Sequence, residues 1–242
     1  MTGVGGVRLS VSTWQQPMPS APSAGRAAVL DHLVGRIVAF GPRRVSVAVD
    51  GLTASGKTTF GHELAQRLAD AGRVALRASL DDFKRRWDDR HLYDRLSGEG
   101  YYRNAYDVDA VRRLLLEPAA SDGTGRLALC SIDPITQVDH STTVVEMPSD
   151  GVLVVDGVFA FRPELNRYWD LRIWMHVDTE LSVRRGTARD AEREGGTAQA
   201  EALHRDRYLA AETIYIAEET PMDVADVVVD NTNFERPRIQ RR

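Results

Sequence analysis

A glycine-rich segment, GLTASGKT at residues 51–58, has the residue types and the spacing of a phosphate-binding loop. Glycines at its first and sixth positions permit a tight backbone path whose amide groups point at phosphate. The lysine is expected to reach the β- and γ-phosphates of a nucleotide, and the threonine hydroxyl to join the coordination of Mg²⁺. The loop therefore predicts a site for ATP or another nucleoside triphosphate, and its expected contacts are Gly51, Ala54, Ser55, Gly56, Lys57, Thr58 and Thr59.

Carboxylates follow three of the apolar runs that resemble buried strands. Asp81 and Asp82 end the run from 74 to 80, Asp156 ends the run from 152 to 155, and Asp178 follows residue 177. Parallel sheets bind ligands outside the carboxyl ends of their strands, so these acids are expected where chemistry would occur. We assign Asp156 to the metal, directly or through water. The alternative is a turn or N-cap aspartate, which is common before glycine.

Alternating strand and helix patterns predict the elements that position these residues. Short apolar, β-branched runs cover residues 45–49, 74–80, 152–155, 171–177 and 224–229. Helical patterns cover residues 27–38, 57–71, 107–116, 179–194 and 198–219. The strand before the phosphate loop and the helix after it argue against a chance match in a glycine-rich turn. The alternation predicts an α/β fold with a parallel sheet covered by helices on both faces.

The sequence predicts a tail, a single domain and a small inserted hairpin. Residues 1–23 are rich in Pro, Ser and Ala and are expected to form a flexible tail before a single domain at 24–242. Residues 126–147 alternate less regularly and contain Asp133-Pro134, which predicts a small antiparallel hairpin inserted into the main sheet. This hairpin could contact an acceptor or be a plain surface feature.

Four segments together resemble the uridine kinase and phosphoribulokinase-like family. They are the phosphate loop, SLDDF at 79–83, VVDGVFAF at 154–161 and LSVRRGTARD at 181–190, and the similarity spans residues 45–232. The phosphate loop is the only one of these segments that is a specific motif by itself. The other three support the resemblance through their order and spacing along the chain. The resemblance implies a P-loop kinase fold with an arginine-bearing helical lid at about 181–197, a divalent metal, and transfer to a hydroxyl of a nucleoside or related small molecule.

The resemblance also implies roles for single residues. Asp81 matches the aspartate that accepts the proton of the attacking hydroxyl, although local turn geometry could present Asp82 instead. Arg184, Arg185 and Arg189 match the lid arginines, which would close over the nucleotide and neutralise charge on the transferred phosphoryl group. The alternative is a solvated helix with Arg–Asp and Arg–Glu pairs.

The sequence indicates the residues that contact the acceptor less clearly than those that bind the nucleotide. The segment GEGYYRNAYD at 98–107 could line an acceptor pocket or belong to the core or an interface, and the segment KRRWDDRH at 84–91 could contact an acidic acceptor or form a solvated loop. The family's pyrimidine-reading tyrosine and histidine lack clear counterparts in the hairpin. The candidate acceptor contacts are Asp82, Phe83, Tyr101, Tyr102, Arg103, Asp133 and His140.

Composition narrows the function classes. The 242 residues carry 31 basic and 35 acidic side chains, so no bulk charge favours nucleic acid. A single cysteine, Cys130, fits a reducing cytosol, and neither a secretory signal nor a membrane span is evident. We expect a soluble cytoplasmic protein without membrane or nucleic-acid partners; self-association is left open.

The sequence thus predicts an ATP-dependent kinase for a small-molecule hydroxyl, with a nucleoside as the leading acceptor. Within the same class, pantothenate, a sugar phosphate or a specialised metabolite remain alternative acceptors. A nucleotide-dependent switch is a different class, but the chain lacks the Asn-Lys-x-Asp guanine motif of GTPases. A nucleic-acid-binding ATPase is disfavoured by the acidic balance.

Overall fold

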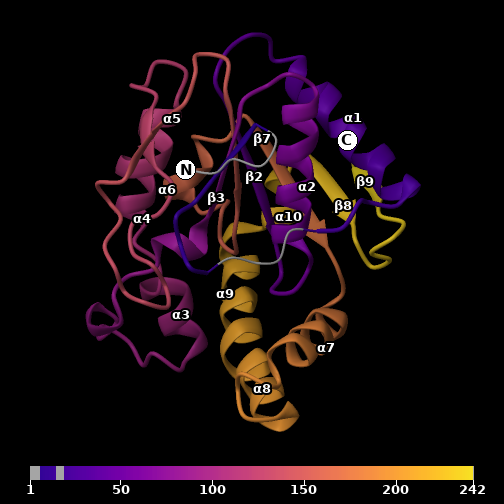
Figure 1. The fold of residues 1–242 in the computed structure, drawn as a ribbon. Coiled ribbons are helices and arrows are strands. Elements are labelled where there is room, and N and C mark those ends of the chain that lie inside the picture. Colours follow the sequence, from indigo (N-terminus) through magenta and orange to yellow (C-terminus); the bar gives the residue numbers. More distant parts are fainter. Residues whose placement is uncertain (1–5, 15–18, 242) are drawn as a thin grey trace.

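A mostly parallel seven-stranded sheet forms the centre of the molecule (Figure 1). The computed structural model describes residues 6–14 and 19–241. The strand order is β1-β3-β6-β2-β7-β8-β9, and only β9 is antiparallel to its neighbour. The strands are β1 (Val7–Leu9), β3 (Ala75–Ser79), β6 (Val152–Asp156), β2 (Val45–Gly51), β7 (Leu171–His176), β8 (Val227–Asp230) and β9 (Arg238–Arg241). The predicted α/β fold is confirmed.

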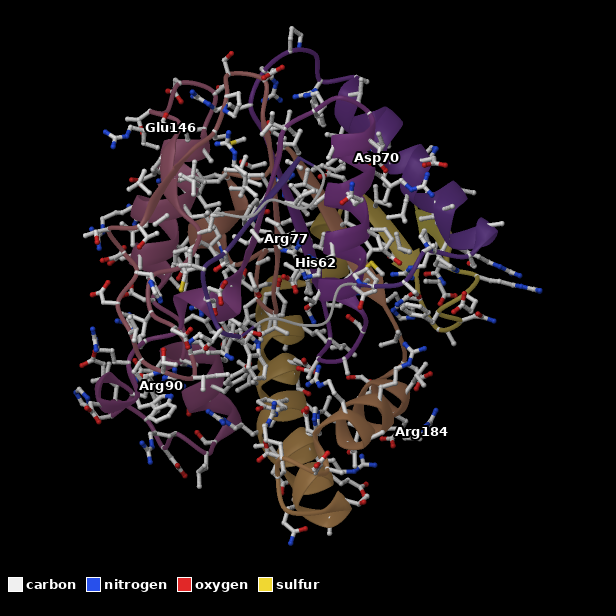
Figure 2. All side chains as sticks on the ribbon, viewed as in Figure 1. His62, Asp70, Arg77, Arg90, Glu146 and Arg184 are labelled. Atoms are coloured by element: carbon white, nitrogen blue, oxygen red, sulfur yellow. The ribbon has the colours of Figure 1, made fainter. Side chains whose placement is uncertain are left out.

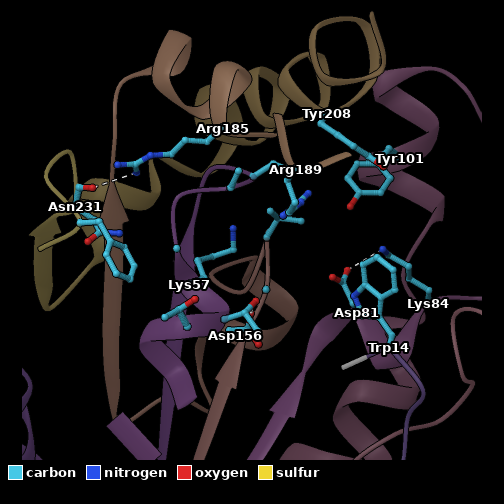
Figure 3. A pocket seen from close by; sticks show the side chains of 18 of the residues that line it. Trp14, Lys57, Asp81, Lys84, Tyr101, Asp156, Arg185, Arg189, Tyr208 and Asn231 are labelled. Carbon is cyan, nitrogen blue, oxygen red and sulfur yellow. Dashed lines mark hydrogen bonds and ion pairs between the residues drawn. The ribbon is translucent and has the colours of Figure 1, made fainter. Parts of the chain in front are cut away.

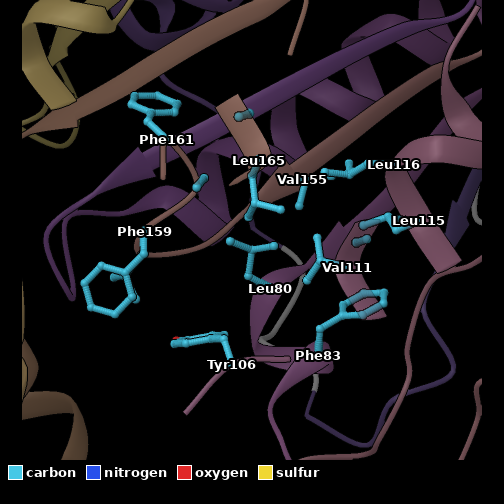
Figure 4. Close-up of a cluster of buried hydrophobic side chains, with 14 of the residues drawn as sticks. Leu80, Phe83, Tyr106, Val111, Leu115, Leu116, Val155, Phe159, Phe161 and Leu165 are labelled. Carbon is cyan, nitrogen blue, oxygen red and sulfur yellow. The ribbon is translucent and has the colours of Figure 1, made fainter. Parts of the chain in front are cut away.

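Each face of the sheet is covered by its own hydrophobic core, because successive side chains of a strand point to opposite faces. Val45, Val47 and Val49 of β2 pack with α1 (Ala24–Val38) and α2 (Lys57–Asp70), whereas Ala48 faces the second core. The helices of the second face are α3 (Gly98–Asn104), the continuous helical segment at 108–119, α6 (Pro163–Asn166) and α9 (Ala210–Glu219). Figure 4 shows part of this second core.

The helical segments agree with the predicted ranges. Residues 108–119 form one run of α4 (Val108–Ala110), a π-helical stretch and α5 (Glu117–Ala119). Residues 197–219 form another, from α8 (Thr197–Leu203) through a π-helical stretch at 204–209 to α9. The helix α7 (Thr179–Asp190) and α8 extend beyond the sheet at the bottom of Figure 1.

The structure corrects three details of the predicted organisation. Residues 7–9 do not belong to a free tail: they form β1, which pairs in parallel with β3, although residues 1–5 and 15–18 lie outside the described part. The hairpin strands β4 (Arg126–Ala128) and β5 (Val144–Glu146) form a separate two-stranded sheet rather than joining the main one. The last parallel strand begins at Val227, because Pro221–Val224 forms the short helix α10.

None of the helices in the described part of the chain combines the length and the hydropathy that a membrane span requires.

Candidate active site

A cavity of about 400 Å³ opens at the carboxyl ends of the parallel strands (Figure 3). The phosphate loop forms its floor. At its edge, Asp81 comes after β3, and Asp156 is the last residue of the neighbouring β6. Arg185 and Arg189 enter it from α7. Residues far apart in the sequence therefore meet at the sheet edge where a parallel α/β fold binds its ligands.

The phosphate loop follows the tight path that its glycines allow. Gly56 has φ of 93°, and a Cβ placed there would lie 2.5 Å from Nδ2 of Asn231, so this position requires glycine. The next residue begins α2, whose N-terminal amides favour an anion. The Lys57 ammonium donates to the carbonyl oxygens of Gly51 and Leu52, at 3.0 and 2.7 Å. These contacts hold the Lys57 side chain against the backbone of the loop.

The helices α7 and α9 hold the tip of the loop through Thr53. The Thr53 amide and hydroxyl both donate to Oε1 of Glu212 in α9, at 2.5 and 2.6 Å. The hydroxyl of Ser182 in α7 donates to the Thr53 carbonyl oxygen at 2.6 Å. Burial raises the pKa of Glu212, although the Thr53 hydroxyl and the charge of Lys57 oppose this shift.

A network of buried polar side chains contacts the other side of the loop. Asn231, which directly follows β8, donates from Nδ2 to the Ser55 carbonyl oxygen at 2.8 Å and accepts from Arg26 at 3.0 Å. The Arg26 Nε lies 2.6 Å from Glu63, and both side chains are buried. These side-chain contacts link α1, α2 and the end of β8 to the loop.

Thr58 and Asp156 form the candidate metal site. The Thr58 hydroxyl donates to Asp156 Oδ2 at 2.5 Å, and the second carboxylate oxygen, Oδ1, accepts from Arg77 at 2.6 Å. Gly61 provides the space for the buried guanidinium, since a Cβ there would lie 2.6 Å from it. Figure 2 shows His62 beside Arg77. Burial, with the charge of Arg77, lowers the pKa of His62 to about 4, so this imidazole is neutral near pH 7.

Asp81 is the carboxylate of the SLDDF segment that lines the cavity. The Tyr106 hydroxyl donates to its Oδ1 at 3.0 Å, and the Lys84 ammonium lies 2.8 Å from the same oxygen. Burial opposes ionisation, but the charge of Lys84 and these hydrogen bonds hold the pKa of Asp81 below its usual value. The Tyr101 hydroxyl in turn lies 2.9 Å from that of Tyr106. Asp81 is therefore an ionised, oriented carboxylate.

Asp82 lies on the other side of the same turn. Its side chain is 1% exposed and borders a separate small cavity of about 30 Å³. Burial raises the pKa of Asp82 to about 7, against hydrogen bonds from Ser10 and Ser12. The 3₁₀ turn at Leu80–Phe83 thus presents only the first of the two acids to the main cavity.

The lid arginines have partners within the protein. Arg185 donates to the carbonyl oxygens of Asn231 and Thr232, and Arg189 donates from two nitrogens to its neighbour Asp190 at 2.8 Å. Both side chains nevertheless line the cavity. Arg184 is exposed on the outer side of α7 and does not line the cavity, so its role as a nucleotide contact stays a prediction (Figure 2).

Of the predicted acceptor contacts, only Tyr101 lines the main cavity, and the structure places the others elsewhere. Phe83 and Tyr102 lie in the hydrophobic core. Asp133 is buried and accepts from the amide and hydroxyl of Thr13 and from the turn that follows it, so it stabilises a loop. Arg103 forms ion pairs with Glu99 and Glu218 outside the cavity, which His140 also does not line.

Several residues that line the cavity are not singled out by the sequence motifs. Asn231 could have been found, because it directly follows a parallel strand at the ligand-binding edge. Lys84 belongs to the basic and aromatic segment at 84–91, which by itself does not distinguish an acceptor contact from a solvated loop. The others carry no sequence signal for a site, because only the packing of distant segments brings them to the cavity: Trp14, Tyr208 and Phe234.

Comparisons with known proteins agree with this geometry. No protein-family model matches the chain. The uridine kinase of Leuconostoc citreum (strain KM20) is 27% identical over 179 residues, which cover 70% of this chain and 78% of that protein. A possible uridine kinase from Bacillus stearothermophilus has a similar fold, with a TM-score of 0.62 and 24% identity over 84% of this chain and 97% of the other.

A putative fructose transport system kinase from Silicibacter sp. TM1040 has the same fold at a TM-score of 0.65, with 22% identity over 79% of this chain and 94% of the other. The similar folds thus include proteins described as kinases for different acceptors. The resemblance that the motifs indicated is confirmed: the chain is similar in sequence to a uridine kinase and shares its fold with proteins described as kinases.

Proposed function

We propose that the protein transfers the γ-phosphoryl group of ATP, or of another nucleoside triphosphate, to a hydroxyl of a small molecule held beside Asp81. The main support is that Lys57, Asp81 and Asp156 line one cavity together with Arg185 and Arg189. A phosphate cradle, a metal-binding carboxylate and an ionised base thereby face the same space. Phosphoryl transfer depends mainly on such positioning and electrostatic stabilisation.

Each group has one task in this proposal. The loop amides and Lys57 bind the β- and γ-phosphates, and the two arginines neutralise charge on the transferred phosphoryl oxygens. Asp81 orients the acceptor hydroxyl and takes its proton while the phosphoryl group leaves the nucleoside diphosphate. Thr58 and Asp156 have the hydroxyl and carboxylate donors that suit Mg²⁺, which when bound would neutralise phosphate charge.

A nucleoside is the first candidate acceptor. The 27% identity to a uridine kinase supports it, and the Tyr101 ring in the cavity wall could stack on a base. A non-nucleoside acceptor is the second candidate, and a cation beside the proposed base favours it. The Lys84 ammonium lies between Asp81 and the Tyr101 and Tyr106 rings, where it could bind an anionic group of the acceptor.

The first experiment measures Mg-ATP turnover with nucleosides, pantothenate and sugar phosphates, reading ADP release and product mass together. We expect ADP release that depends on one acceptor class, and a phosphorylated product of matching mass. Lys57→Ala is the control, because it should weaken nucleotide use with every acceptor. Acceptor-independent ADP release, with no phosphorylated product from any class, would favour a nucleotide switch and contradict the proposal.

A further inference from the structure

Trp14 lies in the loop after β1 and reaches the main cavity from the N-terminal part of the chain. It is half-buried and lines this cavity together with Tyr101 of α3. In Figure 3 it lies on the same side of the cavity as Asp81 and Lys84, whereas Asn231 lies on the opposite side. Trp14 therefore belongs to the end of the cavity where the acceptor would be held.

The small cavity that Asp82 borders also places Trp14 next to the end of β3. Trp14 lines this second cavity as well, and so does Ser79, the last residue of β3. Thr58 and Asp156 line both cavities, as Trp14 does. The indole thus lies where the two cavities adjoin, close to the turn that follows β3.

Contacts to two parts of the molecule hold the backbone of Trp14 at the cavity. The preceding strand β1 pairs in parallel with β3 of the main sheet. The Thr13 amide and hydroxyl donate to the buried carboxylate of Asp133 at 2.6 and 2.9 Å. The Trp14 amide donates to Ser12 Oγ at 3.0 Å. The main sheet and the turn that begins at Asp133 therefore fix the position from which the indole enters the cavity.

Arg193, three residues after the end of α7, contacts the ring of Trp14. Its guanidinium carbon lies 5.3 Å from the centroid of the ring, a distance at which a cation is attracted to an aromatic face. Arg193 also lines the cavity and forms ion pairs with Asp190 at 3.3 Å and Glu194 at 2.9 Å. The N-terminal segment and the predicted lid thus meet at the cavity through Trp14.

An indole at this place gives the acceptor end of the cavity a broad apolar surface. Pockets for small molecules are lined mainly by apolar and aromatic side chains, with a few polar groups that fix the orientation of the ligand. Asp81 and Lys84 are such polar groups here, and Trp14 and Tyr101 are the aromatic ones. The hairpin region at 126–147, where acceptor contacts were a possibility, contributes no residue to this cavity.

We propose that Trp14 is an acceptor-binding residue whose indole packs against the base of a nucleoside, so that the N-terminal segment supplies a contact that the hairpin does not. The inference rests on the proposed function and favours its first candidate acceptor. The indole is uncharged and flat, and its contact therefore selects for a planar ring rather than for a charged group.

Tryptophan fluorescence and calorimetry test this contact in the full chain. The protein is loaded with Mg²⁺ and a non-hydrolysable ATP analogue, so that the phosphate loop is filled, and is titrated with uridine, cytidine and adenosine and, separately, with ribose, which lacks a base. We expect at least one nucleoside to bind and to change the fluorescence of the wild type. Trp14→Phe should lose this change but keep the affinity within about threefold, and Trp14→Ala should bind the nucleoside about tenfold more weakly, as expected for a lost base–aromatic contact. Ribose binding should not respond to either substitution.

Trp87→Ala is the matched control, because Trp87 is 50% exposed and does not line the main cavity. It should leave nucleoside affinity unchanged. Nucleotide affinity and melting temperature show that each variant is folded. Failure of every nucleoside to bind the loaded wild-type protein, or equal affinity in wild type and Trp14→Ala, would overturn the inference.

Turnover separates the inference from the proposed function and from a merely structural role of Trp14. Trp14→Ala should raise the KM of the nucleoside about tenfold and change the KM of ATP by less than about threefold, and Trp14→Phe should restore the first value. A change in the KM of ATP alone would show that Trp14 only positions Arg193, and would overturn the contact with the acceptor. Turnover of sugar phosphates but of no nucleoside would also overturn it and leave the kinase function intact. Nucleoside binding that depends on Trp14, without phosphoryl transfer to any acceptor, would instead contradict the kinase proposal.

Discussion

At the scale of single residues, Asp81 owes its properties to Tyr106 and Lys84. The phenol orients one carboxylate oxygen, and the ammonium favours the ionised form. Because phosphoryl transfer has a loose transition state, the carboxylate needs to align the acceptor hydroxyl more than to deprotonate it beforehand. The adjacent Asp82 has none of these contacts and is buried away from the main cavity.

Asp81→Asn should lower kcat by about 10² to 10⁴, because the amide cannot take the acceptor proton. Nucleotide affinity should change by less than about threefold, since Asp81 does not belong to the phosphate cradle. Steady-state kinetics and nucleotide titration measure the two effects. Asp82→Asn is the matched control and should retain turnover. Equal loss in both variants, or normal turnover of Asp81→Asn, would contradict the assignment of the base.

The ion pair between Arg77 and Asp156 holds the carboxylate of the candidate metal site in place. Arg77→Met leaves a buried carboxylate without its counter-ion, which should lower the free energy of unfolding by roughly 3–5 kcal/mol. Mg-ATP should raise the melting temperature of this variant by more than it raises that of the wild type, because the metal supplies the missing positive charge. Urea unfolding and melting curves with and without Mg-ATP measure both effects.

Arg67→Met is the control for this prediction. The pair of Arg67 with Asp31 is exposed, so its loss should cost at most about 1 kcal/mol. If Arg77→Met were as stable as this control, Arg77 would not be needed to hold Asp156.

At the scale of elements, α7 and α9 are joined to the phosphate loop through Thr53. Glu212 accepts from the amide and hydroxyl of this residue, and Ser182 donates to its carbonyl oxygen. Ser182 lies on the same helix as Arg185 and Arg189. The helix that carries the lid arginines is therefore tied directly to the loop that would bind the phosphates.

Glu212→Ala should destabilise this connection, because it leaves two donors of Thr53 without their acceptor at a cost of about 1–3 kcal/mol each. We expect a lower melting temperature and weaker nucleotide binding. Glu212→Gln keeps an acceptor oxygen and should recover most of both. Thermal unfolding and nucleotide titration measure the changes; identical nucleotide affinity in all three proteins would show that the loop does not need this support.

At the scale of the whole molecule, buried acids make stability depend on pH. Burial raises the pKa of Asp82 to about 7 and that of Asp50 to about 6, so the folded state keeps these protons to a higher pH than the unfolded chain. Their favourable contribution is therefore complete below about pH 4 and is lost as the pH rises towards 7. Asp190 acts in the opposite direction, but its lowered pKa places its transition at acidic pH.

Asp82→Asn should flatten the pH dependence of stability between about pH 4 and 7. Each raised acid changes the free energy of unfolding by up to about 1.4 kcal/mol per pH unit in its window. Urea unfolding at several pH values measures the slope, and the exposed Asp122→Asn should leave it unchanged. A slope in Asp82→Asn equal to that of the wild type would show that Asp82 titrates normally.

The sequence alone determined the local chemistry and the order of the elements. A phosphate loop needs consecutive residues at fixed spacing, and a buried parallel strand is an apolar run that ends in a polar residue, so both are readable from the chain. The fold class, the phosphate loop and the resemblance to kinases followed from these patterns. Local periodicity also gave most element boundaries. It failed at the start of the run predicted as a strand from residue 224, because Val224 is the last residue of the helical turn α10.

Only the tertiary structure decided which side chains share the cavity. Whether Asp81 or Asp82 faces it depends on one 3₁₀ turn, and the exclusion of Tyr102, Asp133 and Arg103 depends on which neighbours cover each side chain. Contacts of this kind arise from packing between distant segments, and local sequence patterns carry no information about them.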